Sequence, residues 1–135
     1  MLSEPTFNTG LVDGLSAALG ELKESVPGLI TACVATRDGF EIARLHIDND
    51  QRKLAAMASS MHALGDALAA EATLGECLNV IIEGSTGKAV MLTVPDAGQD
   101  KVLVAAASAE TNLAILLIST RNCCAKLAEI SKQIG

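Results

Sequence analysis

Aromatic side chains are almost absent from this sequence, which has two phenylalanines and no tyrosine or tryptophan in 135 residues. Base-stacking platforms, aromatic cages and most sugar-stacking surfaces depend on such rings. Cations are also scarce: the sequence has ten Lys and Arg residues and sixteen Asp and Glu residues, which gives a net charge of −6. Nucleic-acid binding by phosphate neutralisation requires clustered cations. We therefore expect no nucleic-acid partner.

Long apolar runs are missing as well. No stretch reaches the roughly 18 to 20 apolar residues that cross a bilayer. The first ten residues, MLSEPTFNTG, carry neither a cationic flank nor a hydrophobic segment of the kind found in export signals. We expect no direct membrane insertion and a cytoplasmic location.

The spacing of the four cysteines argues against a metal or redox site. No two of Cys33, Cys77, Cys123 and Cys124 have the two-residue separation typical of zinc and dithiol motifs. Cys123 and Cys124 are adjacent in a helical pattern, where successive side chains point about 100° apart. We expect four reduced, buried thiols, with a surface thiol as the alternative, and neither a metal nor a cofactor.

Apolar periodicity and turn residues predict eight elements in the order αββαβββα. The three helices are expected at residues 11–26, from a cap at Asp48 to about Ala72, and at 113–134. The five strands are expected at residues 29–36, 40–47, 77–83, 88–94 and 101–107.

Local signals support the ends of these elements. Asn8 or Thr9 can cap the first helix, and Asp48 can cap the second with Gln51 as its reciprocal partner. Asp38-Gly39 supplies the positive-φ residues of a tight hairpin turn.

The strands also predict how the sheet is covered. Several are nearly continuous apolar runs, which is typical of strands covered on both faces. We expect one domain over residues 1–135, with residues 1–8 as a flexible lead. Its five-stranded antiparallel sheet should carry one helix on one face and two on the other, an α/β sandwich.

Motifs that suggest chemistry have simpler explanations. Gly84–Lys88 ends like a phosphate-binding loop, but a strand pattern follows it where a helix should begin, so a hairpin turn is expected. Asp48–Asp50 lacks the rest of a calcium loop and is expected to cap a helix. His46 and His62 have no nucleophile or metal motif around them. We expect that the protein is not an enzyme.

The second helix has two faces of different character. We expect its main apolar stripe to pack on the sheet: Leu54, Met57, Ala58, Met61, Leu64, Gly65, Leu68 and Ala72. The opposite face should carry charges in a monomer, yet it consists of small residues with polar neighbours at its edge: Ala56, Ser59, Ala63, Asp66, Ala67 and Ala70. Alanine favours helices in general, which is one explanation. The other, which we favour, is a contact face for a partner or a second copy.

Three local motifs and their order resemble the Roadblock family of dynein-light-chain-related domains, and its bacterial MglB-type members in particular. Pro27-Gly28-Leu29 leads into the first strand, and Val34–Ala43 (VATRDGFEIA) forms the first hairpin. Asn112-Leu113 opens the last helix after the strand VLVAAAS.

The resemblance implies a profilin-like or longin-like sandwich, with the first and last helices on one face and the second on the other. It also implies a homodimer in which the third strands of two protomers pair and the second helices lie side by side as a platform. The pairing strand maps to Cys77, Leu78, Asn79, Val80, Ile81, Ile82 and Glu83, and the platform to residues 50–70.

These implications lead to a functional hypothesis. We expect a homodimeric, non-catalytic regulator or scaffold that binds a small Ras-like GTPase through its second helix. The alternative is a structural dimerisation or adaptor module of a larger complex with no GTPase partner. A small-ligand sensor is disfavoured, because the expected interior lacks aromatics and convergent polar groups.

Overall fold

The computed structural model describes residues 5–45, 53–97 and 99–134. Its elements are α1 (Thr9–Ser25), β1 (Leu29–Thr36), β2 (Glu41–Arg44), α2 (Leu54–Glu71), β3 (Val80–Glu83), β4 (Gly87–Val94), β5 (Lys101–Ser108) and α3 (Leu113–Ile134). The predicted order αββαβββα is confirmed.

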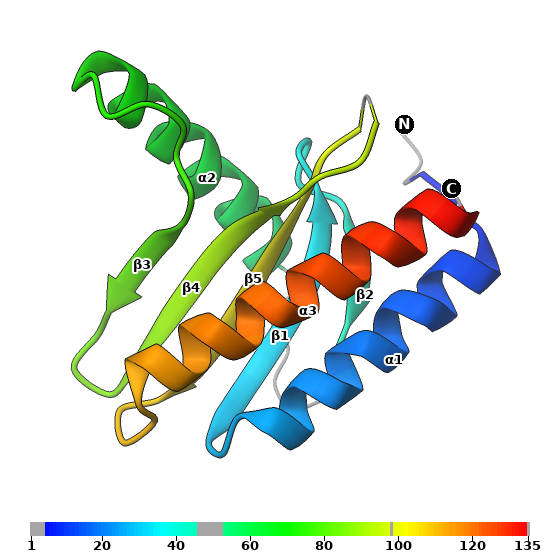
Figure 1. The fold of residues 1–135 in the computed structure, drawn as a ribbon, viewed down its shortest axis with the longest axis horizontal. Helices are drawn as coiled ribbons and strands as arrows, with labels where there is room; N and C mark the ends of the chain where they lie inside the picture. The colour runs from blue at the N-terminus through cyan, green and yellow to red at the C-terminus, as the bar shows by residue number, and fades with distance from the viewer. Residues whose placement is uncertain (1–4, 46–52, 98, 135) are drawn as a thin grey trace.

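The strands form one antiparallel sheet in the order β2-β1-β5-β4-β3. Figure 1 shows α1 and α3 side by side on one face of this sheet and α2 on the other. The predicted sandwich, with two helices on one face and one on the other, is confirmed. The strand order places β2 and β3 at the two edges of the sheet.

The larger core lies between the sheet and the pair α1 and α3. Its largest side chains are fully buried leucines: Leu15, Leu19, Leu103, Leu116 and Leu127. Asn8 fixes the start of α1, because its Oδ1 accepts from the backbone N–H of Gly10 at 2.8 Å and of Leu11 at 3.2 Å. No helix in the described part of the chain is long and apolar enough to cross a membrane.

Both predicted hairpin turns are confirmed. Gly39 has φ +97°, the positive value that the β1–β2 turn requires. Gly84 N–H donates to the Gly87 carbonyl at 2.7 Å in the turn between β3 and β4. The Gly-Lys sequence therefore lies in a turn that leads into a strand.

Two predicted strands are shorter in the structure. β2 ends at Arg44, and the rest of its predicted range falls partly on residues outside the described part, as do Asp48 and Gln51 of the predicted cap. β3 begins at Val80 instead of Cys77. The residues just before Val80 lie beside α2 instead of pairing with β4, since the Cys77 side chain lies next to Gly65 of that helix.

Candidate protein-interaction surface

α2 faces the sheet with small and polar side chains. The buried ones are Ala55, Ala58, Ser59, His62 and Ala69. Ser59 Oγ donates to the Thr36 carbonyl at 2.7 Å, and His62 Nε2 lies 2.5 Å from Thr93 Oγ1. These side chains hold the helix close to β1 and β4.

The predicted orientation of α2 is therefore wrong for most of its large side chains. Leu54 and Ala58 of the stripe expected on the sheet do lie against the core beneath α2. Four other large members are exposed instead: Met57 (60%), Met61 (37%), Leu64 (63%) and Leu68 (66%). We call these four residues the methionine–leucine stripe. Gly65 shows why the helix turns this way, because a Cβ there would lie 2.8 Å from Val80 Cγ2, too close for a large side chain to enter.

The exposed stripe is energetically costly in an isolated protomer. Fully burying an aliphatic or methionine side chain stabilises a protein by about 1.5 to 3 kcal/mol, so four side chains that remain 37 to 66% exposed forgo roughly 3 to 7 kcal/mol in water. Clustered exposed apolar side chains of this kind mark interaction sites. The sequence pattern identifies these residues as apolar but assigns them to the wrong surface.

The edge strand β3 adds a second apolar feature beside α2. Leu78, just before the strand, is 71% exposed, and Ile81 and Ile82 within it are each 41% exposed. The expectation that this strand is covered on both faces does not hold in the protomer, whereas the central strand β5 is almost entirely buried. The predicted pairing segment thus contains the open edge of the sheet, and Cys77, Leu78 and Asn79 precede the strand itself.

The backbone of β3 has unpaired groups on its outer side. β3 pairs with β4 in the register Ile81↔Val90 and Ile82↔Ala89. In an antiparallel pair, every second residue directs its backbone N–H and C=O towards the neighbouring strand. Because Gly84 N–H donates to the Gly87 carbonyl, Ile82 also directs its N–H and C=O towards β4. Ile81 and Glu83 direct theirs outward, where another strand can pair with them.

A second exposed face of α2 consists of Ala56, Ala63, Ala67 and Ala70, which we call the alanine face. Asp66 lies half-buried at its border, where its Oδ2 accepts from Arg37 Nη2 at 2.9 Å. Ser59, predicted at the same border, is only 6% exposed because its hydroxyl is bonded to β1, which corrects that prediction. At about 100° per residue, the alanine face and the methionine–leucine stripe flank the buried side of the helix on opposite sides.

The cysteines are free thiols in the structure. Cys33, Cys123 and Cys124 are buried as predicted, but Cys77 is half-buried at the junction of α2 and β3. Burial raises the pKa of the Cys33 and Cys123 thiols to about 12 and also raises the pKa of Cys124. Three of the four thiols are therefore protonated and unreactive near neutral pH.

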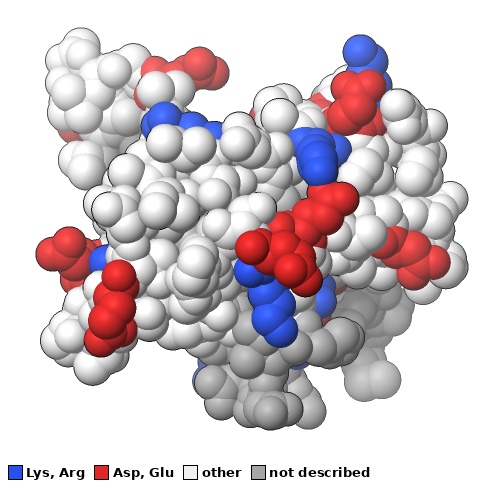
Figure 2. Space-filling model, turned by 60° about the horizontal axis from the view of Figure 1, so that its bottom comes forward, with Lys and Arg blue, Asp and Glu red and all other residues white. Residues whose placement is uncertain are grey.

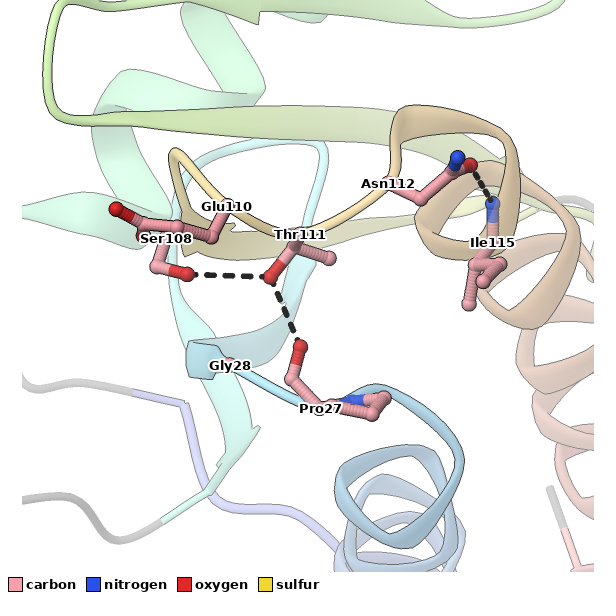
Figure 3. A pocket seen from close by; sticks show the side chains of 7 residues that line it. All are labelled: Pro27, Gly28, Ser108, Glu110, Thr111, Asn112 and Ile115. Atoms are coloured by element: carbon pink, nitrogen blue, oxygen red, sulfur yellow. Dashed lines mark hydrogen bonds between the residues drawn. The ribbon is translucent and has the colours of Figure 1, made fainter.

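A cavity of about 390 Å³ lies where α1 meets β1 and β5 meets α3. Figure 3 shows that its polar groups bond to one another: Thr111 Oγ1 donates to the Pro27 carbonyl at 2.8 Å, and Asn112 Oδ1 accepts from the Ile115 N–H at 3.1 Å. A Cβ on Gly28 would clash with Thr111 Oγ1. The hydrogen bond between Thr111 and Pro27 joins the α1–β1 loop to the β5–α3 loop, so we interpret these residues as stabilising the fold.

Charge is dispersed over the face drawn in Figure 2. Figure 2 shows Lys and Arg intermixed with Asp and Glu as separate islands on a largely uncharged face. Within residues 5–45, 53–97 and 99–134, no group of three or more His, Cys, Asp and Glu side chains is placed to hold a metal ion. We therefore take the apolar surface of α2 and β3 as the candidate functional site.

Comparison with known protein families identifies the middle of the chain. The Roadblock/LC7 domain model matches residues 18–107, from the middle of α1 to the end of β5. This range contains α2 and β3. No curated protein matches the chain.

Solved structures with the same fold include bacterial proteins. MglB of Myxococcus xanthus is 18% identical, with a TM-score of 0.81, and the match covers 94% of this chain and 93% of that one. The gliding protein MglB of Thermus thermophilus is 16% identical, with a TM-score of 0.80 and coverage of 96% and 98%. An MglB with a tetrameric arrangement is 19% identical, with a TM-score of 0.79 and coverage of 96% and 97%. At such identities these likenesses establish the fold.

Proposed function

Because the chain belongs to the Roadblock/LC7 domain family, we propose that it is a homodimeric, non-catalytic regulator or scaffold of a small Ras-like GTPase. The observation that carries this proposal is the apolar surface on which the methionine–leucine stripe borders the open edge of β3. Regulators of this family, as the sequence resemblance implies, use the corresponding strand and helix to dimerise and to bind their GTPase.

A second copy of the chain suits this surface. In an isologous dimer the same patch faces itself across a two-fold axis, so the β3 edges pair while the two stripes cover each other. Pairing satisfies the outward backbone groups of Ile81 and Glu83. One contact thus removes both the apolar stripe and the open edge from water.

The alanine face remains available once the dimer has formed. It lies on the other side of α2 from the stripe, and its small side chains allow the backbone of a partner helix to approach closely. The Arg37–Asp66 ion pair at its border adds a polar rim, as is usual around protein interfaces. We assign this face to the GTPase and the methionine–leucine stripe to self-association.

The experiment has two steps. Light scattering should give a mass of about 28 kDa, twice the 13.9 kDa of the chain. Affinity capture with mass spectrometry should then recover a small GTPase, and calorimetry with the purified GTPase should show binding that depends on whether GDP or a non-hydrolysable GTP analogue is loaded. A stable dimer with no GTPase among its specific partners would instead favour the dimerisation or adaptor module.

A further inference from the structure

Two oppositely charged side chains flank β3 without meeting. Arg121 of α3 donates from Nη2 to Asn79 Oδ1 at 3.0 Å, just before the strand begins. Glu83 ends the strand and is exposed. Within the described residues, neither side chain forms an ion pair. Lys88 lies opposite Glu83 in the β3–β4 register, but its Nζ donates to the Ala109 and Thr111 carbonyls instead of to that carboxylate. Each protomer therefore offers one charged side chain without an ion-pair partner at either end of its edge strand.

Both charges lie on the α3 face of the sheet. Ile81 pairs with Val90, which is buried in the core beneath α1 and α3. Side chains alternate along a strand, so Asn79 and Glu83 share that face with Ile81. Val80 lies on the other face, where it packs against the core beneath α2.

Self-pairing of β3 has two natural registers. Antiparallel pairing joins residues whose backbone groups point outward, and in β3 these are Ile81 and Glu83. The two-fold axis then passes either between the two Ile81 residues or between the two Ile82 residues. The first register places Glu83 opposite Asn79 of the partner subunit, and the second places it opposite Ile81 of the partner subunit.

Charge and packing both favour the first register. Residues directly opposite in an antiparallel pair have Cβ atoms about 4.5 to 5.5 Å apart. Glu83 then reaches the guanidinium that Asn79 of the partner subunit holds in place, and Val80 meets Ile82 of the partner subunit. In the second register Glu83 faces an aliphatic side chain, and Val80 faces a glycine.

We infer that the dimer is centred on Ile81 and that Glu83 of each protomer forms an ion pair with Arg121 of the partner subunit. The two symmetry-related pairs fix the register of the extended sheet. This inference rests on the proposed function, because it specifies the dimer that the function requires.

Charge exchange provides the first test. Glu83→Lys and Arg121→Glu should each weaken dimerisation by about tenfold or more, because each substitution acts twice in a two-fold dimer. The double variant should restore the dissociation constant of the wild type, measured by analytical ultracentrifugation. Raised salt should weaken the wild-type dimer more than either single variant. The matched controls are Glu24→Lys, Lys23→Glu and their combination, on α1, which packs near β2 at the opposite edge of the sheet, and they should leave dimerisation unchanged.

Cross-linking provides the second test, in a Cys77→Ser background. The register centred on Ile81 places the two copies of that residue opposite each other, so Ile81→Cys should form a disulfide-linked dimer under mild oxidation. Ile82→Cys should not, because its two copies are offset along the strands beyond disulfide reach.

The outcomes separate this inference from its premise. A stable dimer in which Ile82→Cys cross-links, or in which the charge exchange restores nothing, overturns the register and leaves the homodimer in place. A chain that is monomeric at every concentration overturns both the inference and the proposed function. Circular dichroism of each variant shows whether a loss of dimer follows from unfolding.

Discussion

Gly65 of α2 lies against Val80 at the start of β3, so closely that a Cβ on residue 65 would approach Val80 Cγ2 to 2.8 Å. This contact fixes how near the helix comes to the sheet edge and thereby which of its faces stays in solvent. Large side chains do not fit between the two elements, so the methionine–leucine stripe points away from them.

Gly65→Val should lower the free energy of unfolding by about 1 to 3 kcal/mol, the usual cost of overpacking. The matched control is Gly20→Val in α1, where a Cβ meets nothing within 4 Å. Glycine and valine both have modest helix propensity, so the control should change stability by no more than about 0.5 kcal/mol. Urea denaturation at equal protein concentration measures both, and equal effects would show that the contact with Val80 is unimportant.

Ile81→Pro should abolish the dimer while preserving the protomer. The N–H of Ile81 points away from β4, so proline removes a donor needed only by a partner strand. Light scattering should give 13.9 kDa, the mass of one chain. Ile82→Pro removes a bond to β4 and should also destabilise the protomer, by about 1 to 3 kcal/mol. A dimeric Ile81→Pro variant would place the interface elsewhere.

Leu64→Lys should dissociate the dimer without unfolding the chain. Leu64 is 63% exposed in the protomer, so its replacement leaves both cores intact. In the dimer the substitution buries two unpaired charges across the two-fold axis, at a cost of several kcal/mol. Ser60→Lys, an equally cationic change at an exposed position of the same helix, should remain dimeric in sedimentation velocity.

Ala63→Arg should eliminate GTPase capture and leave the dimer intact. Ala63 is exposed on the alanine face, so the substitution should change the free energy of unfolding by no more than about 0.5 kcal/mol. The long cation prevents the close approach of a partner helix and would be buried unpaired. Capture equal to that of the wild type would remove the alanine face from the proposed interface. Arginine at Ala17, an exposed alanine of α1, is the control and should not affect capture.

Stability should decline above about pH 9 because of the buried thiols. Desolvation raises the pKa of Cys33 and Cys123 from their usual 9.0 to about 12. Between these values the unfolded chain loses protons that the folded chain retains, so rising pH favours unfolding. The thiol contribution is complete below about pH 9 and is lost progressively towards pH 12. Urea midpoints across this range should fall less steeply for the Cys33→Ala/Cys123→Ala double variant.

Features that depend only on neighbouring residues could be predicted from the sequence. The Asn8 cap, the Gly39 turn and the turn between Gly84 and Gly87 follow from short-range chemistry, and each is where the pattern predicts it. β1 occupies the predicted residues 29–36 because a continuous apolar run identifies a central strand. The order of the elements and the family resemblance follow from these local signals.

The side of α2 that faces the sheet depends on contacts between residues that are far apart in the sequence. One side of this helix carries the large apolar side chains of the methionine–leucine stripe, and much of the rest carries small side chains. Helical periodicity therefore gives two candidates for the buried side, and hydrophobicity favours the one with the larger side chains. The choice depends on residues distant in sequence: Thr36 and Thr93 bond the buried Ser59 and His62, and Val80 leaves room only for glycine at position 65. Large apolar groups are thereby left exposed in the protomer, which the periodicity of the sequence does not reveal.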